Sequence, residues 1–197
     1  MSLHEHMISL HPILDKELKF AFFSNNKVCQ TSINRHALKH RAIVRKDDSA
    51  EYDMIIDGFL KTPNLFKFTV VRNPFDKVVS AFSYLRSLKK PKISPKISFE
   101  DFICGPFNEQ GADFDPHFNI QYDRAYFEGE QFVDFIAKHE TINHDWLMIC
   151  RNMGHDGPLP HANKSSHASY QSMYSKDSRR VVERLYGRDI AVFGYQF

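Results

Sequence analysis

The chain has 197 residues, of which 42% are hydrophobic and 25% charged, and its formal net charge at pH 7 is +2. This length and balance indicate one soluble, globular domain rather than a fibrous or disordered chain. The small net charge gives no indication of nucleic-acid binding, although a phosphate site can still be locally basic. No apolar run approaches the roughly 18 residues that a membrane helix needs.

The ends and the cysteines suggest where the chain resides. Three cysteines at wide spacing do not form the pattern of a disulfide framework, so we expect a reducing, cytoplasmic compartment. The N-terminus is polar and rich in histidine, unlike a signal peptide. Its histidines lack the cysteine or carboxylate partners of a recognisable metal site, and no metal is predicted. We expect residues 1–18 to be a flexible extension and residues 19–197 to form the domain.

Two units of strand, loop and helix follow one another in the first half. Residues 19–24 (KFAFFS) are a short apolar run typical of a buried strand, and residues 31–40 predict a helix. Residues 66–71 (FKFTVV) predict a second buried strand. After Pro74, apolar residues recur every three or four positions over residues 75–85, which predicts a second helix.

The second half continues the alternation of helices and strands. A helix cap is expected at Ser98, a loop over 105–118, a strand over 132–137, a helix over 142–153, and a last helix between Ser175 and Gly187. The sequence therefore predicts an α/β protein with a P-loop-like three-layer fold, in which a central parallel sheet is flanked by helices.

The first candidate phosphate site follows the first strand. In open α/β sheets, ligands bind beyond the carboxyl ends of the strands, and a helix N-terminus there favours anions. In residues 25–32 (NNKVCQTS), Lys27 adds a positive charge, and Thr31 and Ser32 add hydroxyl donors. The glycines of a P-loop are absent, so an ordinary helix start with a surface lysine is the alternative.

The second candidate phosphate site follows the second strand. Arg72 stands at the strand end, where a guanidinium can hold a phosphate through paired N–H bonds. Ser80 lies among apolar residues of the next helix, where a buried hydroxyl needs a partner. In the structural alternative, Arg72 pairs with Asp76 and Ser80 bonds back to its own helix.

These strings resemble a known family. Residues 70–85 (VVRNPFDKVVSAFSYL) resemble the 3′-phosphate-binding motif of sulfotransferases that use 3′-phosphoadenosine-5′-phosphosulfate (PAPS), especially the carbohydrate, Golgi-type family, and residues 27–32 resemble its 5′-phosphosulfate loop. Segments at 115–121, 139–145, 159–165 and 189–195 are similar to family segments in the same order. Asn73 departs from the usual aspartate. The membrane anchor and disulfides of eukaryotic members are not seen in this sequence, so Golgi residence is not implied.

The resemblance implies a function and a set of site residues. It implies in-line transfer of the sulfuryl group from PAPS to a hydroxyl of a carbohydrate-like acceptor, without a metal, leaving 3′,5′-phosphoadenosine (PAP). Lys27 would stabilise the leaving group, and Lys164 with Ser165 would close over the donor. The residues that would hold its phosphates are Asn26, Lys27, Val28, Cys29, Gln30, Thr31, Ser32, Arg72 and Ser80.

The general base and the competing functions stay open. We favour His117 as the base because imidazole titrates near neutral pH, with His161 and Glu140 as alternatives. The basic residues 89–96 are a candidate contact for the acceptor, which we expect to be a glycan or glycoside. The alternative functions are a nucleotide kinase-like P-loop enzyme, or a non-catalytic module of the same fold that binds PAP or a glycan.

Overall fold

A computed structural model of the chain describes residues 1–15, 19–33, 43–44, 56, 58–154, 158–159 and 169–197. Its contacts divide the chain into two compact units, which are described separately. Unit 1 comprises residues 1–25, 29–71 and 123–163, and unit 2 comprises residues 26–28, 72–122 and 164–197.

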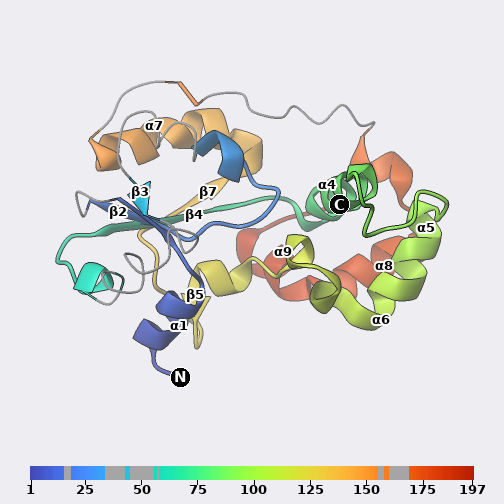
Figure 1. Cartoon of the computed structure of the whole chain (residues 1–197), viewed down its shortest axis with the longest axis horizontal. Coiled ribbons are helices and arrows are strands. Elements are labelled where there is room, and N and C mark those ends of the chain that lie inside the picture. Colours follow the sequence, from blue (N-terminus) through green and yellow to red (C-terminus); the bar gives the residue numbers. More distant parts are fainter. Residues whose placement is uncertain (16–18, 34–42, 45–55, 57, 155–157, 160–168) are drawn as a thin grey trace. The chain divides into compact units, whose positions relative to one another are not determined.

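Unit 1 is built on a five-stranded sheet in the order β3-β1-β2-β4-β7 (Figure 1). Strands β2, β4 and β7 pair in parallel, whereas β1 runs antiparallel to both β2 and β3. Phenylalanine rings stack between β2 and β4, with 4.8 Å between the ring centroids of Phe22 and Phe68. The strands are β1 (Ile13–Asp15), β2 (Phe20–Phe22), β3 (Ile43–Val44), β4 (Phe66–Val71) and β7 (Phe135–Lys138).

Helices flank this sheet, as the sequence predicted for an α/β fold. Helix α7 (Ile142–Met153) packs against β7 and β4 through its buried face and ends at Gly154, whose φ of +67° suits glycine. In Figure 1, α7 lies above the sheet, and α1 (Leu3–Ser9) lies below it. The hairpin of β5 (Tyr126–Phe127) and β6 (Glu130–Gln131) lies beside α1, where the His6 ring contacts Phe127.

The N-terminal residues need a correction. The sequence predicts a flexible extension over residues 1–18, but β1 lies between β2 and β3 in the sheet, and Ile13 and Leu14 are buried. The apolar pair is too short for a periodic pattern, because β1 has only three residues. Helix α1 has its own capping box at Ser2 and Glu5. The domain therefore begins before residue 19.

Unit 2 gathers around helix α4 (Pro74–Ser87) and an aromatic core. Asn73 caps α4 by accepting a hydrogen bond from the backbone of Phe75, and Pro74 occupies the first turn. Residues 105–118, expected as a loop, contain short helical turns. The other elements are α5 (Phe99–Phe102), η2 (Ile103–Phe107), α6 (Asn108–Gln110), η3 (Gly111–Phe114), η4 (Pro116–Phe118), η7 (Tyr170–Met173), α8 (Lys176–Leu185) and α9 (Gly187–Phe193).

All three cysteines are free thiols. Within the described residues, no helix combines the length and the apolar character that crossing a membrane requires.

Candidate active site

The main chain of Arg72 is held from both sides by one glutamine. The Arg72 N–H donates to Gln121 Oε1 at 2.9 Å, and Gln121 Nε2 donates to the Arg72 carbonyl at 2.8 Å. The backbone N–H groups of Gln121 and Tyr122 in turn donate to the buried carboxylate of Asp189. Burial raises the pKa of Asp189, and these backbone donors offset part of the rise. This network fixes the point where the chain leaves β4.

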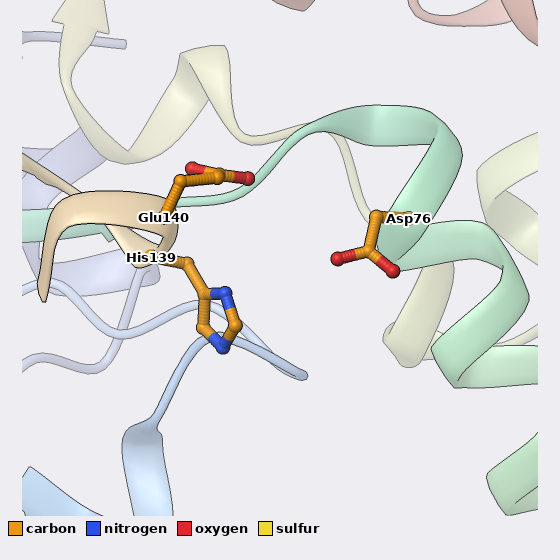
Figure 2. A group of neighbouring side chains, drawn as sticks. All are labelled: Asp76, His139 and Glu140. Atoms are coloured by element: carbon orange, nitrogen blue, oxygen red, sulfur yellow. The ribbon is translucent and has the colours of Figure 1, made fainter. Parts of the chain in front are cut away.

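The guanidinium of Arg72 has two partners within unit 2. Its Nε donates to Asp76 at 2.8 Å, and its Nη1 donates to the Lys27 carbonyl at 2.9 Å. Figure 2 shows Asp76 on the first turn of α4. The remaining nitrogen, Nη2, makes no hydrogen bond with any described residue. The structural alternative of an Arg72–Asp76 pair is thus present, yet the guanidinium keeps a donor for a further acceptor.

Lys27 lies on a short loop segment anchored to unit 2. Asn26 Nδ2 donates to the Pro116 carbonyl at 3.0 Å, and the Lys27 carbonyl accepts from Arg72. The Lys27 ammonium lies 4.3 Å from the ring centroid of Tyr84, and it has no hydrogen bond or ion pair among the described residues. Burial, and then the charge of Arg72, lower the pKa of Lys27.

The backbone of this loop adopts a conformation that usually requires glycine. Lys27 has φ +65° and Cys29 has φ +58°. A left-handed residue with a side chain costs roughly 1–2 kcal/mol. Alternating conformations of this kind turn successive N–H groups toward an anion. The loop therefore has a feature of phosphate-binding loops although it lacks their glycines.

A helical turn begins directly after this loop, in unit 1. The Ile33 N–H donates to the Cys29 carbonyl at 3.0 Å. Of the helix predicted over residues 31–40, the part after Ile33 lies outside the described residues. Gln30 Nε2 donates to Ser24 Oγ at 3.2 Å, so this amide stabilises the loop. Thr31 is exposed, whereas Val28 and Ser32 are buried.

Ser80 lies one helical turn beyond Asp76 on α4, and its residue is only 6% exposed. Its hydroxyl makes no hydrogen bond with any described residue, so the structural alternative, a bond back to its own helix, is not formed. A buried hydroxyl without a partner is rare in native proteins and typically costs about 1–3 kcal/mol. This donor is consistent with a ligand that brings its own acceptor.

His117 forms a dyad with a buried aspartate. Its Nδ1 lies 2.6 Å from Asp115 Oδ1, and Lys92 Nζ lies 2.6 Å from the other oxygen, Oδ2. Burial alone would raise the pKa of Asp115, but hydrogen bonds from Lys92 and from the backbone and ring of His117 lower it to about 2. Because the carboxylate is ionised, we assign the Nδ1 hydrogen to this bond. Nε2 is then the nitrogen that can accept a proton.

Tyr84 brings the two sequence-predicted catalytic residues together. Its ring contacts the Lys27 ammonium on one hand and the His117 ring on the other, with 4.9 Å between the two ring centroids and 40° between their planes. Arg72 contacts the Lys27 loop as well. Lys27, Arg72 and His117 therefore belong to one cluster within unit 2.

Sequence reasoning missed several members of this cluster. The spacing of Tyr84, eight residues beyond Asp76 and four beyond Ser80, was the available signal for a shared helix face. Asp115 stood two residues before the predicted base, and Gln121 stood inside a segment already singled out. No local pattern indicated the bond from Lys92 to Asp115.

The other residues predicted for the site belong to unit 1 or lie outside the described residues. Glu140 is exposed and stands in η6 (His139–Thr141) of unit 1, next to His139 (Figure 2). His161, Lys164 and Ser165 lie outside the described residues. Their predicted roles stay predictions.

Known proteins of one family are similar to this chain over most of its length. A model described as "Sulfotransferase family" matches residues 7–196. The chain is 27% identical to carbohydrate sulfotransferase 10 of Homo sapiens over 180 residues, which cover 73% of this chain and 50% of the relative. It is 26% identical to carbohydrate sulfotransferase 10 of Xenopus laevis over 168 residues (66% and 47%), and 24% identical to carbohydrate sulfotransferase 12 of Xenopus laevis over 174 residues (69% and 41%).

The chain spans about half the length of the curated relatives it matches. No solved structure shows significant similarity to it.

Proposed function

Because the chain belongs to the sulfotransferase family, we propose that it moves the sulfuryl group from PAPS to a hydroxyl of a carbohydrate acceptor. The observation that carries the proposal is the contact between Arg72 and Lys27, with 2.9 Å from Nη1 to the carbonyl oxygen. The two residues come from two separate candidate phosphate sites in the sequence. The names of the relatives support a carbohydrate as the acceptor.

The donors left over in unit 2 fit a nucleotide with two phosphate groups. The Ser80 hydroxyl, Arg72 Nη2 and the Lys27 ammonium make no hydrogen bond among the described residues, and all three are donors suited to anionic oxygens. A hydrogen bond to a charged group contributes about 1.5–3 kcal/mol. We assign Arg72 and Ser80 to the 3′-phosphate, which distinguishes PAPS from ATP.

We assign the 5′-phosphosulfate of PAPS to the loop without glycine that follows β2. The groups that would bind it are the Lys27 ammonium, the backbone N–H groups at the start of the helical turn at Gln30, and the hydroxyls of Thr31 and Ser32. The assignment of Lys164 and Ser165 to closure over the donor rests on the sequence resemblance alone.

The reaction then needs a base and a positive charge from the protein. PAPS supplies a sulfuryl group on a phosphate oxygen, so that an S–O bond to the acceptor forms while the S–O bond to the phosphate breaks and PAP leaves. His117 takes the acceptor proton on Nε2, and Asp115 stabilises the resulting imidazolium. Such a base contributes typically about 10²–10⁴-fold. The Lys27 ammonium stabilises the charge that develops on the leaving phosphate oxygen.

The experiment has two parts, a comparison of melting temperatures with two nucleotides and an assay of sulfuryl transfer. PAP should raise the melting temperature more than ATP with Mg²⁺, and ³⁵S-labelled PAPS should label at least one member of a glycan and glycoside library. Arg72→Ala should abolish the PAP effect, whereas Arg86→Ala, in the last turn of α4, should keep it. Stabilisation by ATP with Mg²⁺ alone would favour a nucleotide kinase-like enzyme. PAP binding without transfer to any acceptor would favour the non-catalytic module.

A further inference from the structure

We infer that Tyr84 is a positioning residue for sulfuryl transfer, whose ring holds the Lys27 ammonium and the His117 imidazole at set places. This inference rests on the proposed function and adds a residue that neither the sequence motifs nor the family match assigns. Tyr84 lies near the end of α4, one helical turn beyond Ser80.

Core packing does not account for Tyr84. Its neighbours Phe82 and Leu85 are buried in the aromatic core of unit 2, whereas Tyr84 is 40% exposed. Its hydroxyl makes no hydrogen bond with any described residue. Among the described residues, its aromatic and cation–π contacts are those with Lys27, at 4.3 Å from ammonium to ring centroid, and with His117, at 4.9 Å between centroids. The ring is thus placed against the two residues to which we assign the chemistry.

A ring suits Lys27 better than a carboxylate would. The face of a phenol attracts a cation through its quadrupole but accepts no conventional hydrogen bond. The ammonium is therefore held at one place while its N–H donors stay available to the donor nucleotide. A carboxylate partner would bind the same N–H groups and neutralise the charge that the leaving group needs. The described part of the chain offers Lys27 no carboxylate within ion-pair distance.

A second contact orients His117. Asp115 holds Nδ1 at 2.6 Å and so fixes one edge of the imidazole. A single hydrogen bond leaves the ring free to tilt about that bond. The Tyr84 ring, inclined by 40° to the imidazole plane, limits this tilt from the side. Nε2, the nitrogen assigned as the base, then has a defined direction.

The test compares Tyr84→Phe with Tyr84→Leu, which differ in whether the aromatic ring remains. Tyr84→Phe should keep the rate of transfer from PAPS within about twofold. Tyr84→Leu should lower kcat about tenfold, which is the cation–π contribution expressed as a rate factor. The Kd for PAP should stay the same in both variants, because Arg72 and Ser80 are untouched. Ser83→Ala, at an exposed position of the same helix, serves as the control for general effects on α4.

A structural measurement separates this role from the proposed function. In histidine-selective ¹³C NMR of the free protein, the His117 ring signal should be displaced by the Tyr84 ring current in the wild type and in Tyr84→Phe, and should lose this displacement in Tyr84→Leu. An unchanged kcat in Tyr84→Leu, or an equal loss in Tyr84→Phe, would overturn the inference even if the wild type transfers sulfuryl groups. Failure of the wild type to transfer from PAPS, with the NMR contact intact, would refute the proposed function and this role with it.

Discussion

Ser80→Ala separates a ligand-binding hydroxyl from a structural one, because the two roles predict opposite effects on the free protein. Ser80 is only 6% exposed, and its hydroxyl has no hydrogen-bond partner among the described residues. If the hydroxyl binds a phosphate only when the nucleotide is present, its removal should not destabilise the free protein. If it bonded within its own helix, its removal should cost stability.

The magnitudes follow from these two states. Removal of an unsatisfied buried hydroxyl recovers a desolvation cost of about 1–3 kcal/mol, part of which the small void left behind offsets. Alanine also favours the helix by a few tenths of a kcal/mol, up to about 0.7. We therefore expect the free energy of unfolding to stay equal or to rise by up to about 2 kcal/mol. A lost hydrogen bond to a phosphate, at about 1.5–3 kcal/mol, should weaken the Kd for PAP by about 10- to 150-fold.

Calorimetric titration with PAP and urea unfolding of the free protein measure these two quantities. Ser83→Ala is the matched control, since it makes the same change at an exposed position three residues away on α4 and should leave PAP affinity unchanged. The reasoning fails if Ser80→Ala binds PAP as tightly as the wild type. It also fails if the variant loses stability without PAP, because the hydroxyl would then have a partner in the free protein.

Four further predictions concern Lys27, His117 and Asp115. Lys27→Ala should reduce single-turnover transfer by about 10²–10³-fold, while calorimetry shows a much smaller loss of PAP affinity; equal losses would make Lys27 an anchor. Because burial and Arg72 lower the pKa of Lys27 from 10.5, the wild-type rate should fall with rising pH below the usual lysine range, and Lys27→Arg should move that fall to higher pH in a pH–rate profile. His117→Ala should keep PAP binding and lose about 10²–10⁴-fold in turnover; unchanged turnover would place the base elsewhere. The pKa of Asp115 falls from 3.8 to about 2 on folding, so its contribution of about 2 kcal/mol is present above pH 4 and is lost as the pH falls toward 2; urea unfolding of Asp115→Asn should show that loss at pH 7 and a flatter pH dependence below pH 4.

The helices and strands that could be predicted are those long enough to show a hydrophobic pattern in the sequence. The strand over 66–71 and the helix over 142–153 have the bounds that the sequence predicted. The two- and three-residue strands β3 and β1 escaped prediction, because a pattern needs more residues than they contain. The helical turns within 105–118 were missed for a similar reason: they are short and interrupted at Gly105, whose backbone is not helical.

In the candidate site, too, local features could be predicted and contacts between distant segments could not. Arg72 and Ser80 could be singled out because a strand end and an apolar helix face are local features of the sequence. Tyr84 shares that helix face, but its contact with Lys27 could not be predicted, since it depends on a loop that comes from a distant part of the chain. The same holds for Lys92, whose contact with Asp115 joins two loops. Local spacing thus predicts which residues stand at an element's end, but not which loops meet there.

One guanidinium connects the two parts of the proposed donor site. The left-handed backbone at Lys27 costs roughly 1–2 kcal/mol. Because the loop has no glycine there, this cost must be offset by a stabilising contact. The charge-assisted bond from Arg72 to the Lys27 carbonyl contributes about 1.5–3 kcal/mol, enough to offset that cost. Arg72 can do this and still offer Nη2 to a phosphate, because its fork of five N–H groups serves several acceptors at once. A lysine in its place, with three donors on one atom, could not span Asp76, the loop carbonyl and a phosphate. Binding at the 3′-phosphate and the shape of the 5′ loop would therefore be coupled through a single side chain.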